Sequence, residues 1–332
     1  GRAGTGKSYV INNIAQEYEK EGKKVVKLAF TNIASLNIGG TTIHKFLKLN
    51  EKGELLMSRI SKIKAEYGLI IIDEISMVSS FLWRRLYHLH NLTNIPFLIV
   101  GDFRQIPPVE NMVYEDYREH PTLLELGKKS YIELEKIHRY DTALADLTKN
   151  LDDMMNIKKS DFTPKIGKVN ICYLNKTRKK INALLNNKIK INKPHKVSEQ
   201  SKYINDDTKT YSKNKALKKI YDEDNPTQDI YVYEGLPMIS RLNKDDLLCN
   251  NERFIVKSIG KQIVLESIRA SEKGEEEKHL FNCSLEDLQK YMLCAYCMTT
   301  HKSQGITIQG ALTIHDWDLM SKKLRYTALT RA

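Results

Sequence analysis

The chain begins with an unbroken phosphate-binding loop. Residues 1–8 read GRAGTGKS and match the pattern G-x-x-x-x-G-K-[ST] at every fixed position. The glycines allow backbone N–H groups to close around the phosphates of a nucleotide, Lys7 brings a positive charge to the outer phosphates, and the Ser8 hydroxyl completes a Mg²⁺ shell. In folds of this kind a buried strand normally leads into the loop. No strand precedes it here, so we expect a fragment that lacks its leading strand.

Apolar runs alternate with helical segments over residues 1–140. The segments 69–72 (LIII) and 97–100 (FLIV) are continuously apolar, as expected for strands of a parallel sheet that is covered on both faces. Between the phosphate-binding loop and the first of these strands, we expect a helix over 9–18 and a strand over 24–30. The alternation predicts a doubly wound α/β domain.

The second half has a different pattern. We assign 141–332 to a second domain that carries a mobile, Lys- and Asn-rich insertion at about 195–228. Short strand-like runs follow at 230–233, 237–240, 253–259 and 262–268, and they predict a small β-barrel-like insertion over about 245–292. We expect a strand–helix–strand pattern from 292 to the end.

The charge and cysteine content restrict the partners and the compartment. A net charge of +12 favours a polyanionic partner such as nucleic acid, although a solvated Lys-rich surface from an AT-rich genome would give the same value. Five cysteines without framework spacing indicate a reducing compartment. We therefore expect an intracellular protein, placed in the nucleus or mitochondrion of a eukaryote or at a host-cell replication site of a virus. The abundance of Lys, Asn and Ile favours a large DNA virus or a mobile element as the source.

Two further patterns exclude functions. Cys294 and Cys297 form a single C-x-x-C, whereas a zinc site would need a second pair; two small residues on a buried strand are the simpler interpretation. No apolar run approaches the roughly 18 residues of a membrane span, so no membrane partner is expected.

Residues that could hydrolyse a nucleotide follow the predicted strands. Asp73 and Glu74 come directly after LIII, where Asp73 can hold Mg²⁺ through water and Glu74 can deprotonate an attacking water. Gln105 follows FLIV and can sense a γ-phosphate, although its GDFRQ segment could equally be an ordinary turn. Arg139 and Arg331 are candidate arginine fingers. Spacing alone does not distinguish them from surface arginines.

Eight segments in order resemble the motifs of superfamily 1 DNA helicases of the petite-integration-frequency (Pif) and RecD-like group. Four of them, DEISM, GDFRQIPP, THKSQG and YTALTR, are specific on their own. The matching segments are GRAGTGKS (1–8), FTNIASLNIGGTTIHKF (30–46), IIIDEISMV (70–78), GDFRQIPPV (101–109), LEKIHRY (134–140), EGLPMISRLNKDDLLCNNERFIV (234–256), MTTHKSQGITI (298–308) and YTALTRA (326–332).

This resemblance implies two RecA-like parallel-sheet domains of the P-loop NTPase fold, with ATP and Mg²⁺ between them and a small β-rich, SH3-like insertion in the second. The implied catalytic residues are Lys7, Asp73, Glu74, Gln105, Arg139 and Arg331. The implied nucleotide-binding residues are Gly4, Thr5, Gly6, Lys7, Ser8, Gln304 and Gly305. Ser8 and Asp73 would hold the metal. The implied DNA-binding residues are Thr31, His44, Phe103, Thr300, His301 and Lys302. For His44, a capping or core role is the alternative.

The chain departs from the family pattern in three places. The fourth motif usually reads Phe-Arg-Gln, whereas here it is His138-Arg139-Tyr140, which keeps the arginine but not the hydrogen bond of the Gln. Thr330 stands where Ser is more frequent. The pin that splits duplex DNA in the family would lie at about 46–64, where the sequence is short and contains a hairpin-like LNEKGELL.

The resemblance predicts an ATP-dependent DNA helicase that moves 5′ to 3′ on single-stranded DNA in replication, recombination or repair. Single-stranded DNA, duplex or fork DNA and replication-complex proteins are the expected partners. Two alternatives remain. One is an ATP-driven translocase that displaces proteins and unwinds weakly, which the short pin favours. The other is a non-catalytic nucleic-acid-binding module.

Overall fold

The computed structural model describes residues 1–107, 120–163, 167, 169–192, 232–244, 247–270, 276–308 and 310–331. Its first domain is built on a four-stranded parallel sheet in the order β2-β1-β3-β4. The strands are β1 (Val25–Ala29), β2 (Thr41–Thr42), β3 (Leu69–Asp73) and β4 (Phe97–Ile99). Every residue of β3 is buried, which confirms the prediction from the LIII run. The insertion predicted at about 195–228 lies outside the described residues.

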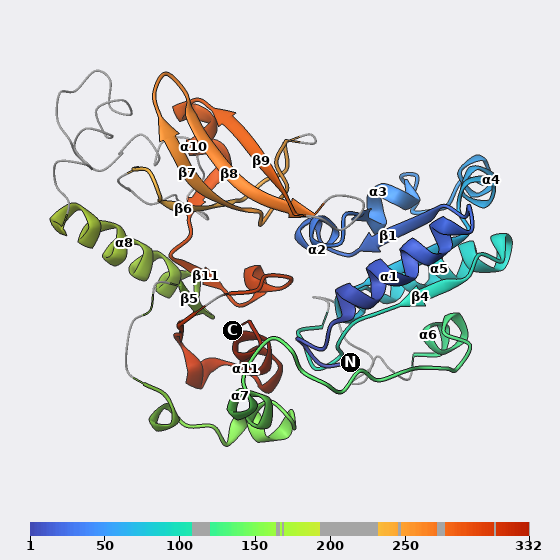
Figure 1. Cartoon of the computed structure of the whole chain (residues 1–332), viewed down its shortest axis with the longest axis horizontal. Coiled ribbons are helices and arrows are strands. Elements are labelled where there is room, and N and C mark those ends of the chain that lie inside the picture. Colours follow the sequence, from blue (N-terminus) through green and yellow to red (C-terminus); the bar gives the residue numbers. More distant parts are fainter. Residues whose placement is uncertain are drawn as a thin grey trace.

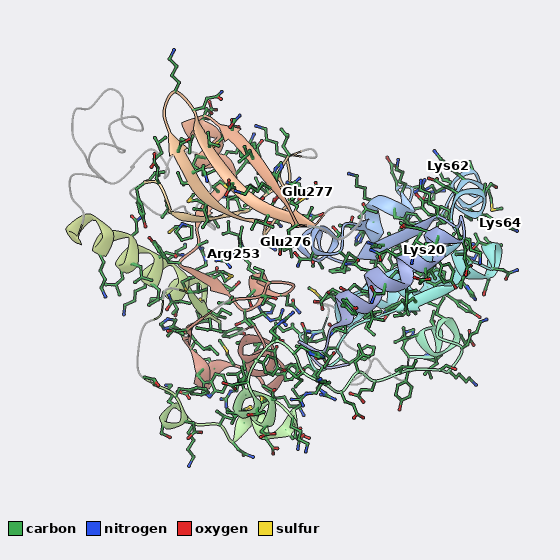
Figure 2. The ribbon with its side chains drawn as sticks, in the orientation of Figure 1. Lys20, Lys62, Lys64, Arg253, Glu276 and Glu277 are labelled. Carbon is green, nitrogen blue, oxygen red and sulfur yellow. The ribbon has the colours of Figure 1, made fainter. Side chains whose placement is uncertain are left out.

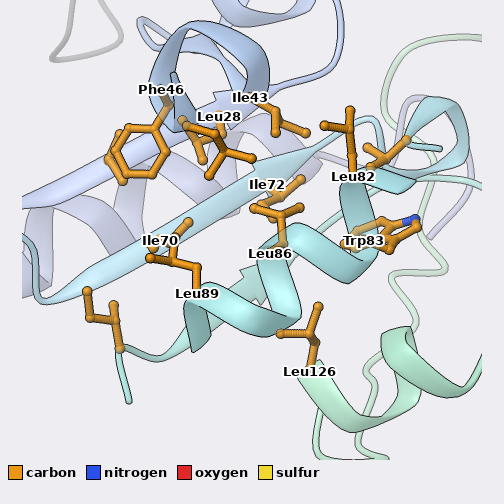
Figure 3. Packing of buried hydrophobic residues seen from close by; sticks show 14 of the residues in the cluster. Leu28, Ile43, Phe46, Ile70, Ile72, Leu82, Trp83, Leu86, Leu89 and Leu126 are labelled. Carbon is orange, nitrogen blue, oxygen red and sulfur yellow. The ribbon is translucent and has the colours of Figure 1, made fainter. Parts of the chain in front are cut away.

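Helices cover both faces of this sheet (Figure 1). They are α1 (Lys7–Lys20), α2 (Asn32–Asn37), α3 (Ile43–Leu47), α4 (Met57–Glu66), α5 (Ser80–Thr93) and α6 (Pro121–Leu126), with the 3₁₀ turn η1 (Ile75–Met77) after β3. Ile70 and Ile72 face α5, where Trp83 and Leu86 are fully buried against them (Figure 3). Ile71 points to the other face and packs with residues of α1, because successive strand residues alternate sides.

The interval 46–64, in which the resemblance places a pin, divides into a turn and a helix. Asn50 and Glu54 close the turn: the Glu54 amide donates to Asn50 Oδ1 at 2.8 Å, and the Asn50 amide donates to the Glu54 carbonyl at 3.1 Å. Helix α4 then turns Ile60 and Ile63 into the core of the first domain. Only the turn is therefore left to project.

The second domain has its own parallel sheet in the order β11-β5-β12. Its strands are β5 (Val169–Cys172), β11 (Cys297–Thr299) and β12 (Leu312–Ile314), and its helices are α7 (Thr142–Leu147), α8 (Asn175–Asn192) and α11 (Lys322–Leu329). Short 3₁₀ turns connect them: η3 (Asp152–Met155), η4 (Lys159–Asp161), η6 (His301–Ser303) and η7 (Trp317–Leu319). The strand–helix–strand pattern expected from 292 onward is present only with a 3₁₀ turn, η6, between β11 and β12, and it is followed by helix α11, whose apolar face packs on this sheet.

An antiparallel module lies above this second sheet (Figure 1). Its strands, in the order β10-β6-β7-β8-β9, are β6 (Pro237–Ser240), β7 (Arg253–Ile259), β8 (Ile263–Ala270), β9 (Glu276–Cys283) and β10 (Met292–Cys294), with helix α10 (Leu285–Tyr291) between the last two. The sheet begins at Pro237, before the predicted boundary at 245. Of the strand predicted at 230–233, Val232 and Tyr233 have no regular structure and the other two residues are not described. The SH3-like classification stays a prediction.

Cys294 and Cys297 are buried in strands, as the simpler interpretation predicted, but on two strands of different sheets, β10 and β11, and not on one. All five cysteines are free thiols. Within the described ranges, no group of three or more His, Cys, Asp or Glu side chains could hold a metal ion. No helix in the described part of the chain is long and apolar enough to cross a membrane.

Candidate nucleotide and DNA sites

The phosphate-binding loop leads directly into α1. Gly4 (φ 78°) and Gly6 (φ 83°) have left-handed backbone conformations that favour glycine. A Cβ atom on Gly4 would also lie 2.7 Å from Cβ of Arg139. Gly6 is the N-cap residue of α1 and supplies no side-chain cap, so the positive end of the helix dipole is open toward the loop. The backbone here is therefore shaped for a phosphate.

Lys7 folds back over this loop. Its ammonium group donates to the carbonyls of Gly1 at 3.2 Å and Arg2 at 2.8 Å. Burial lowers the pKa of Lys7, and the carboxylates of Asp102, Glu74 and Asp73 act in the opposite direction. Thr5 is buried and its hydroxyl donates to the Arg2 carbonyl at 2.8 Å. The ammonium group therefore lies among the backbone groups that would surround the outer phosphates.

Asp73 and Glu74 lie at the carboxyl end of β3. Asp73 is buried, and its Oδ1 accepts the Glu74 amide at 2.8 Å. Burial, and then the neighbouring Glu74, raise the pKa of Asp73 to about 7. Glu74 Oε2 is buried and has no hydrogen-bond partner in the described residues. Carboxylates held close together with one buried, unpartnered oxygen are stabilised by a cation, so the Asp73 and Glu74 oxygens fit a hard divalent ion such as Mg²⁺. Ser8, the other predicted ligand, is exposed in the first turn of α1.

Two arginines lie at the same place, Arg331 from the second domain and Arg139 from the segment just before α7. Arg331 is buried and donates to Gln105 Oε1 at 3.2 Å and to the Thr327 carbonyl at 3.1 Å. Arg139 donates to the Thr330 carbonyl at 3.4 Å. Burial lowers the pKa of both arginines, and in each case the Glu74 carboxylate counteracts it. Gln105 and both arginines thus gather beside the carboxylates of the first domain.

Sequence reasoning missed three residues of this cleft. Asp102 Oδ2 accepts the Ala3 amide at 3.0 Å and the Tyr326 hydroxyl at 2.5 Å. The Tyr140 hydroxyl donates to the Ala3 carbonyl at 3.1 Å, so the residue that replaces the family's Gln supplies a local hydrogen bond of its own. All three residues stand inside the quoted motifs, but nothing in those motifs indicates their partners.

Gln304 and Gly305 lie near different parts of the first domain. Gln304 is buried and its Nε2 donates to the Ile106 carbonyl at 3.4 Å, one residue beyond Gln105. The Gly305 carbonyl accepts Asn37 Nδ2 from α2. Within the described residues, no hydrogen bond joins Gln304 or Gly305 to the phosphate-binding loop. If they contact the nucleotide as predicted, they do so from the edge of the cleft.

The three predicted DNA contacts of the first domain lie on or beside α2, α3 and β4. The Thr31 hydroxyl accepts the Ala34 amide at 3.2 Å as the N-cap of α2. His44 is exposed on α3, which excludes the alternative of a core histidine, and its ring meets Phe30 edge-on with centroids 5.7 Å apart. Phe103 is half-buried against the core.

The three predicted contacts of the second domain differ from one another. His301 is exposed and Lys302 is half-buried. Thr300 is fully buried, and its hydroxyl donates to the Cys172 carbonyl at 3.2 Å. In this structure the Thr300 side chain therefore holds η6 against β5 and is not presented to a ligand.

Lys302 belongs to a group of cations that sequence reasoning missed. Burial, followed by Arg178 on α8 and Arg241 beside β6, lowers the pKa of Lys302 to about 8. Arg178 is only 4% exposed. Arg253, labelled in Figure 2, is the first residue of β7; burial is the only cause that lowers its pKa, so it is not counted in this group. Arg178 lies outside the quoted motifs, and Arg241 lies inside the segment 234–256, where nothing in the pattern indicates its charged neighbours. A group of like charges brought together from several elements fits the phosphates of a nucleic acid.

The fold and the cleft define a P-loop ATPase with two RecA-like domains. A family model described as "AAA domain" matches residues 1–171, more than half of the chain, and the protein belongs to this family. The chain is 35% identical to the ATP-dependent DNA helicase Pif1 of Campylobacter jejuni over 125 residues, 33% of this chain and 28% of that protein. It is 34% identical to human PIF1 over 126 residues, 33% of this chain and 19% of that protein.

Solved structures agree with these relatives. The Pif1 helicase from Candida albicans has a TM-score of 0.62 at 21% identity, and the match covers 100% of this chain and 87% of that one. Bacteroides Pif1 bound to ssDNA has a TM-score of 0.58 at 21% identity and is covered to 85%. The matches confirm the predicted fold and the resemblance to the Pif group of superfamily 1. The chain spans less than a third of the length of the two curated relatives.

Proposed function

We propose that this protein is an ATP-dependent DNA helicase. The observation that carries the proposal is the convergence of Lys7, Asp73 and Glu74 from the first domain with Arg331 from the second, in contact with Gln105. Such a cleft opens or closes when the domains move, which is what a motor driven by a nucleotide requires. The names of the relatives support the same activity.

The residues of the cleft divide the chemistry among them. Lys7 stabilises the negative charge on the outer phosphates, and Arg331 and Arg139 stabilise the charge that develops on the transferring phosphoryl group. Glu74 accepts the proton of the attacking water. Ser8 and Asp73 would hold Mg²⁺, which when bound neutralises phosphate charge. Gln105 accepts a hydrogen bond from Arg331 at 3.2 Å, so a γ-phosphate contact of its side chain would be passed to Arg331 and could report which nucleotide is present.

Helix α2 connects this chemistry to DNA. Its first residue, Asn32, donates to Asn243 Oδ1 near the β-rich module at 2.9 Å, and Asn37 donates to the carbonyl of Gly305. The proposed DNA contacts Thr31 and Lys302 lie on either side of this junction. Closure of the domains on ATP and reopening after hydrolysis would move the two contacts relative to one another and advance the strand.

We further propose translocation from 5′ to 3′, action on duplex or fork DNA, and a role in replication, recombination or repair together with proteins of the replication complex at an intracellular site of DNA synthesis. These statements rest on the resemblance to the Pif group, because the geometry of the cleft indicates neither a direction of movement nor a cellular process.

A second candidate is a translocase that displaces proteins and unwinds weakly. It is favoured by the interval 46–64, where only the Asn50–Glu54 turn is left to act as a pin. A third, a non-catalytic clamp, is disfavoured because the lysine, both carboxylates and both arginines of the cleft are present.

Three measurements on the same preparation separate these candidates. A helicase releases phosphate faster when single-stranded DNA is added and separates a forked duplex. A translocase shows the same stimulation and displaces streptavidin from a biotinylated strand, but separates the fork poorly. Absence of any DNA-stimulated phosphate release would reject both and leave the clamp.

A further inference from the structure

One carboxylate oxygen joins the phosphate-binding loop to the second domain. Asp102 Oδ2 accepts both the amide of Ala3, inside the loop, and the hydroxyl of Tyr326, on α11. The other oxygen accepts the Arg104 amide at 3.0 Å, so the carboxylate is held on both sides. Tyr326 is fully buried and Asp102 is 5% exposed. Hydrogen bonds to a buried carboxylate are among the stronger ones in proteins.

Tyr326 lies in the last turns of α11, and Arg331 follows directly after the C-cap of that helix. The Thr330 amide donates to the Tyr326 carbonyl at 3.0 Å, and Arg331 Nε donates to the Thr327 carbonyl at 3.1 Å. A shift of Tyr326 therefore carries Arg331 with it. Burial and the Asp102 carboxylate raise the pKa of Tyr326 well above its usual value, so the hydroxyl keeps its proton and remains a donor.

We propose that the hydrogen bond between Tyr326 and Asp102 positions Arg331 according to the state of the phosphate-binding loop. Ala3 and Tyr326 share one acceptor oxygen, and the Ala3 amide also donates to the Tyr326 hydroxyl at 3.4 Å, so a change in the loop backbone when phosphates bind alters the bonds that hold α11. Tyr326 is thus a positioning residue that acts through Arg331. The proposal rests on the proposed ATPase activity for its kinetic test.

The ring of Tyr326 also has a packing role, and the test must separate the two. The ring lies in an apolar cluster with Met154, Trp317 and Leu329. Tyr326→Phe keeps this packing and removes only the hydroxyl. We expect the thermal midpoint to stay within a few degrees, the KM for ATP to change less than twofold, and the DNA-stimulated kcat to fall about tenfold.

A double mutant identifies the route of the effect. If Tyr326 acts through Arg331, Tyr326→Phe should cost little further rate in an Arg331→Lys background, because coupled residues are not additive. Tyr140→Phe is the matched control: it removes a hydroxyl bound to the Ala3 carbonyl from the segment before α7, and its effect should multiply with that of Arg331→Lys. An unchanged kcat in Tyr326→Phe, or independent multiplication with Arg331→Lys, would overturn the proposal.

Hydrogen–deuterium exchange without nucleotide tests the same link apart from turnover. In Tyr326→Phe, exchange should speed up both in residues 1–6 and in α11, whereas Tyr140→Phe should affect only the loop. Faster exchange in α11 alone would reject the link. If the wild-type protein hydrolyses no ATP, but Tyr326→Phe still speeds exchange both in residues 1–6 and in α11, the proposed function is rejected and the link is kept.

Discussion

The nucleotide side and the DNA side of this molecule are built in opposite ways. Around the phosphate-binding loop, Lys7 is half-buried and Arg331 is buried, and both have Glu74 as a nearby carboxylate. Around η6, Lys302 has Arg178 and Arg241 as its charged neighbours, and all the influences on its pKa lower it. One side is closed and its charges are balanced, whereas the other is an accumulation of positive charge.

The difference indicates how each side should respond to change. In the balanced cleft each group has one task and one set of partners, so removing it should abolish a step. On the DNA side the cations share the phosphates of a flexible strand, so each should contribute a modest, salt-dependent part. The predictions below test this contrast.

The largest effect is expected for Lys7→Ala. Loss of its ammonium group should lower the DNA-stimulated kcat by about 10³-fold, because a charge aimed at the transition state is removed from a buried site. Affinity for single-stranded DNA should stay within twofold. Lys20→Ala is the control, since Lys20 lies on the same helix but is exposed and paired with Glu17. Phosphate release and fluorescence anisotropy measure the two quantities, and retained turnover would contradict the role of Lys7.

Arg331→Lys should have the next largest effect, a fall in kcat of about 10²-fold. The ammonium keeps the charge but cannot donate to both Gln105 and Thr327 as the guanidinium does. Arg325→Lys serves as the control: Arg325 is equally buried in α11 but donates to the carbonyls of Met154 and Met320. We expect it to lower the thermal midpoint without a matching loss of kcat. Equal kinetic losses in both variants would show that Arg331 only stabilises the helix.

Lys302→Ala should be milder and of a different kind. We expect affinity for single-stranded DNA to fall about tenfold at low salt, and the slope of log affinity against log salt to decrease by about 0.7, the value for one phosphate contact on a single strand. The ATPase rate at saturating DNA should change little. Lys257→Ala, an exposed lysine on β7 near Glu266, is the control and should leave the slope unchanged. An unaltered slope in Lys302→Ala would remove it from the DNA site.

The sequence predicted the nucleotide side better than the DNA side for a physical reason. The phosphate-binding loop and the acidic pair are local patterns, and parallel strands bring their carboxyl ends to one edge of the sheet. The partners of these residues are not local. Tyr326 and Asp102 are 224 positions apart, and no periodicity in either segment links them.

Polarity alone was also a poor guide to exposure near the DNA. Thr300 resembles a surface hydroxyl in the sequence, but β11 pairs with β5 so that Thr299 lies opposite Cys172, and the next residue caps the Cys172 carbonyl. Arg178 is nearly buried because α8 packs on the same sheet. These outcomes depend on strand register and helix packing, which single residues do not reveal.

The smallest predicted effect is the pH dependence that comes from Lys302. It gives the sharpest test of the contrast, because a rise in pH should weaken DNA binding but increase stability. The pKa of Lys302 is lowered to about 8 in the folded protein, below its unfolded value of about 10.4. Between these values the unfolded chain binds more protons, so the Lys302 contribution to the free energy of unfolding should rise with pH. Affinity for single-stranded DNA should instead fall a few-fold from pH 7 to pH 9, as the ammonium that meets a phosphate loses its proton.

Lys302→Arg should remove both trends, because a guanidinium keeps its charge over this range. Anisotropy titrations and urea unfolding at pH 7, 8 and 9 measure the two quantities in parallel. Affinity that stays constant with pH in the wild type, or that falls equally in Lys302→Arg, would mean that the cations beside η6 do not meet the DNA through Lys302. The two sides of the molecule would then differ in burial but not in how they use charge.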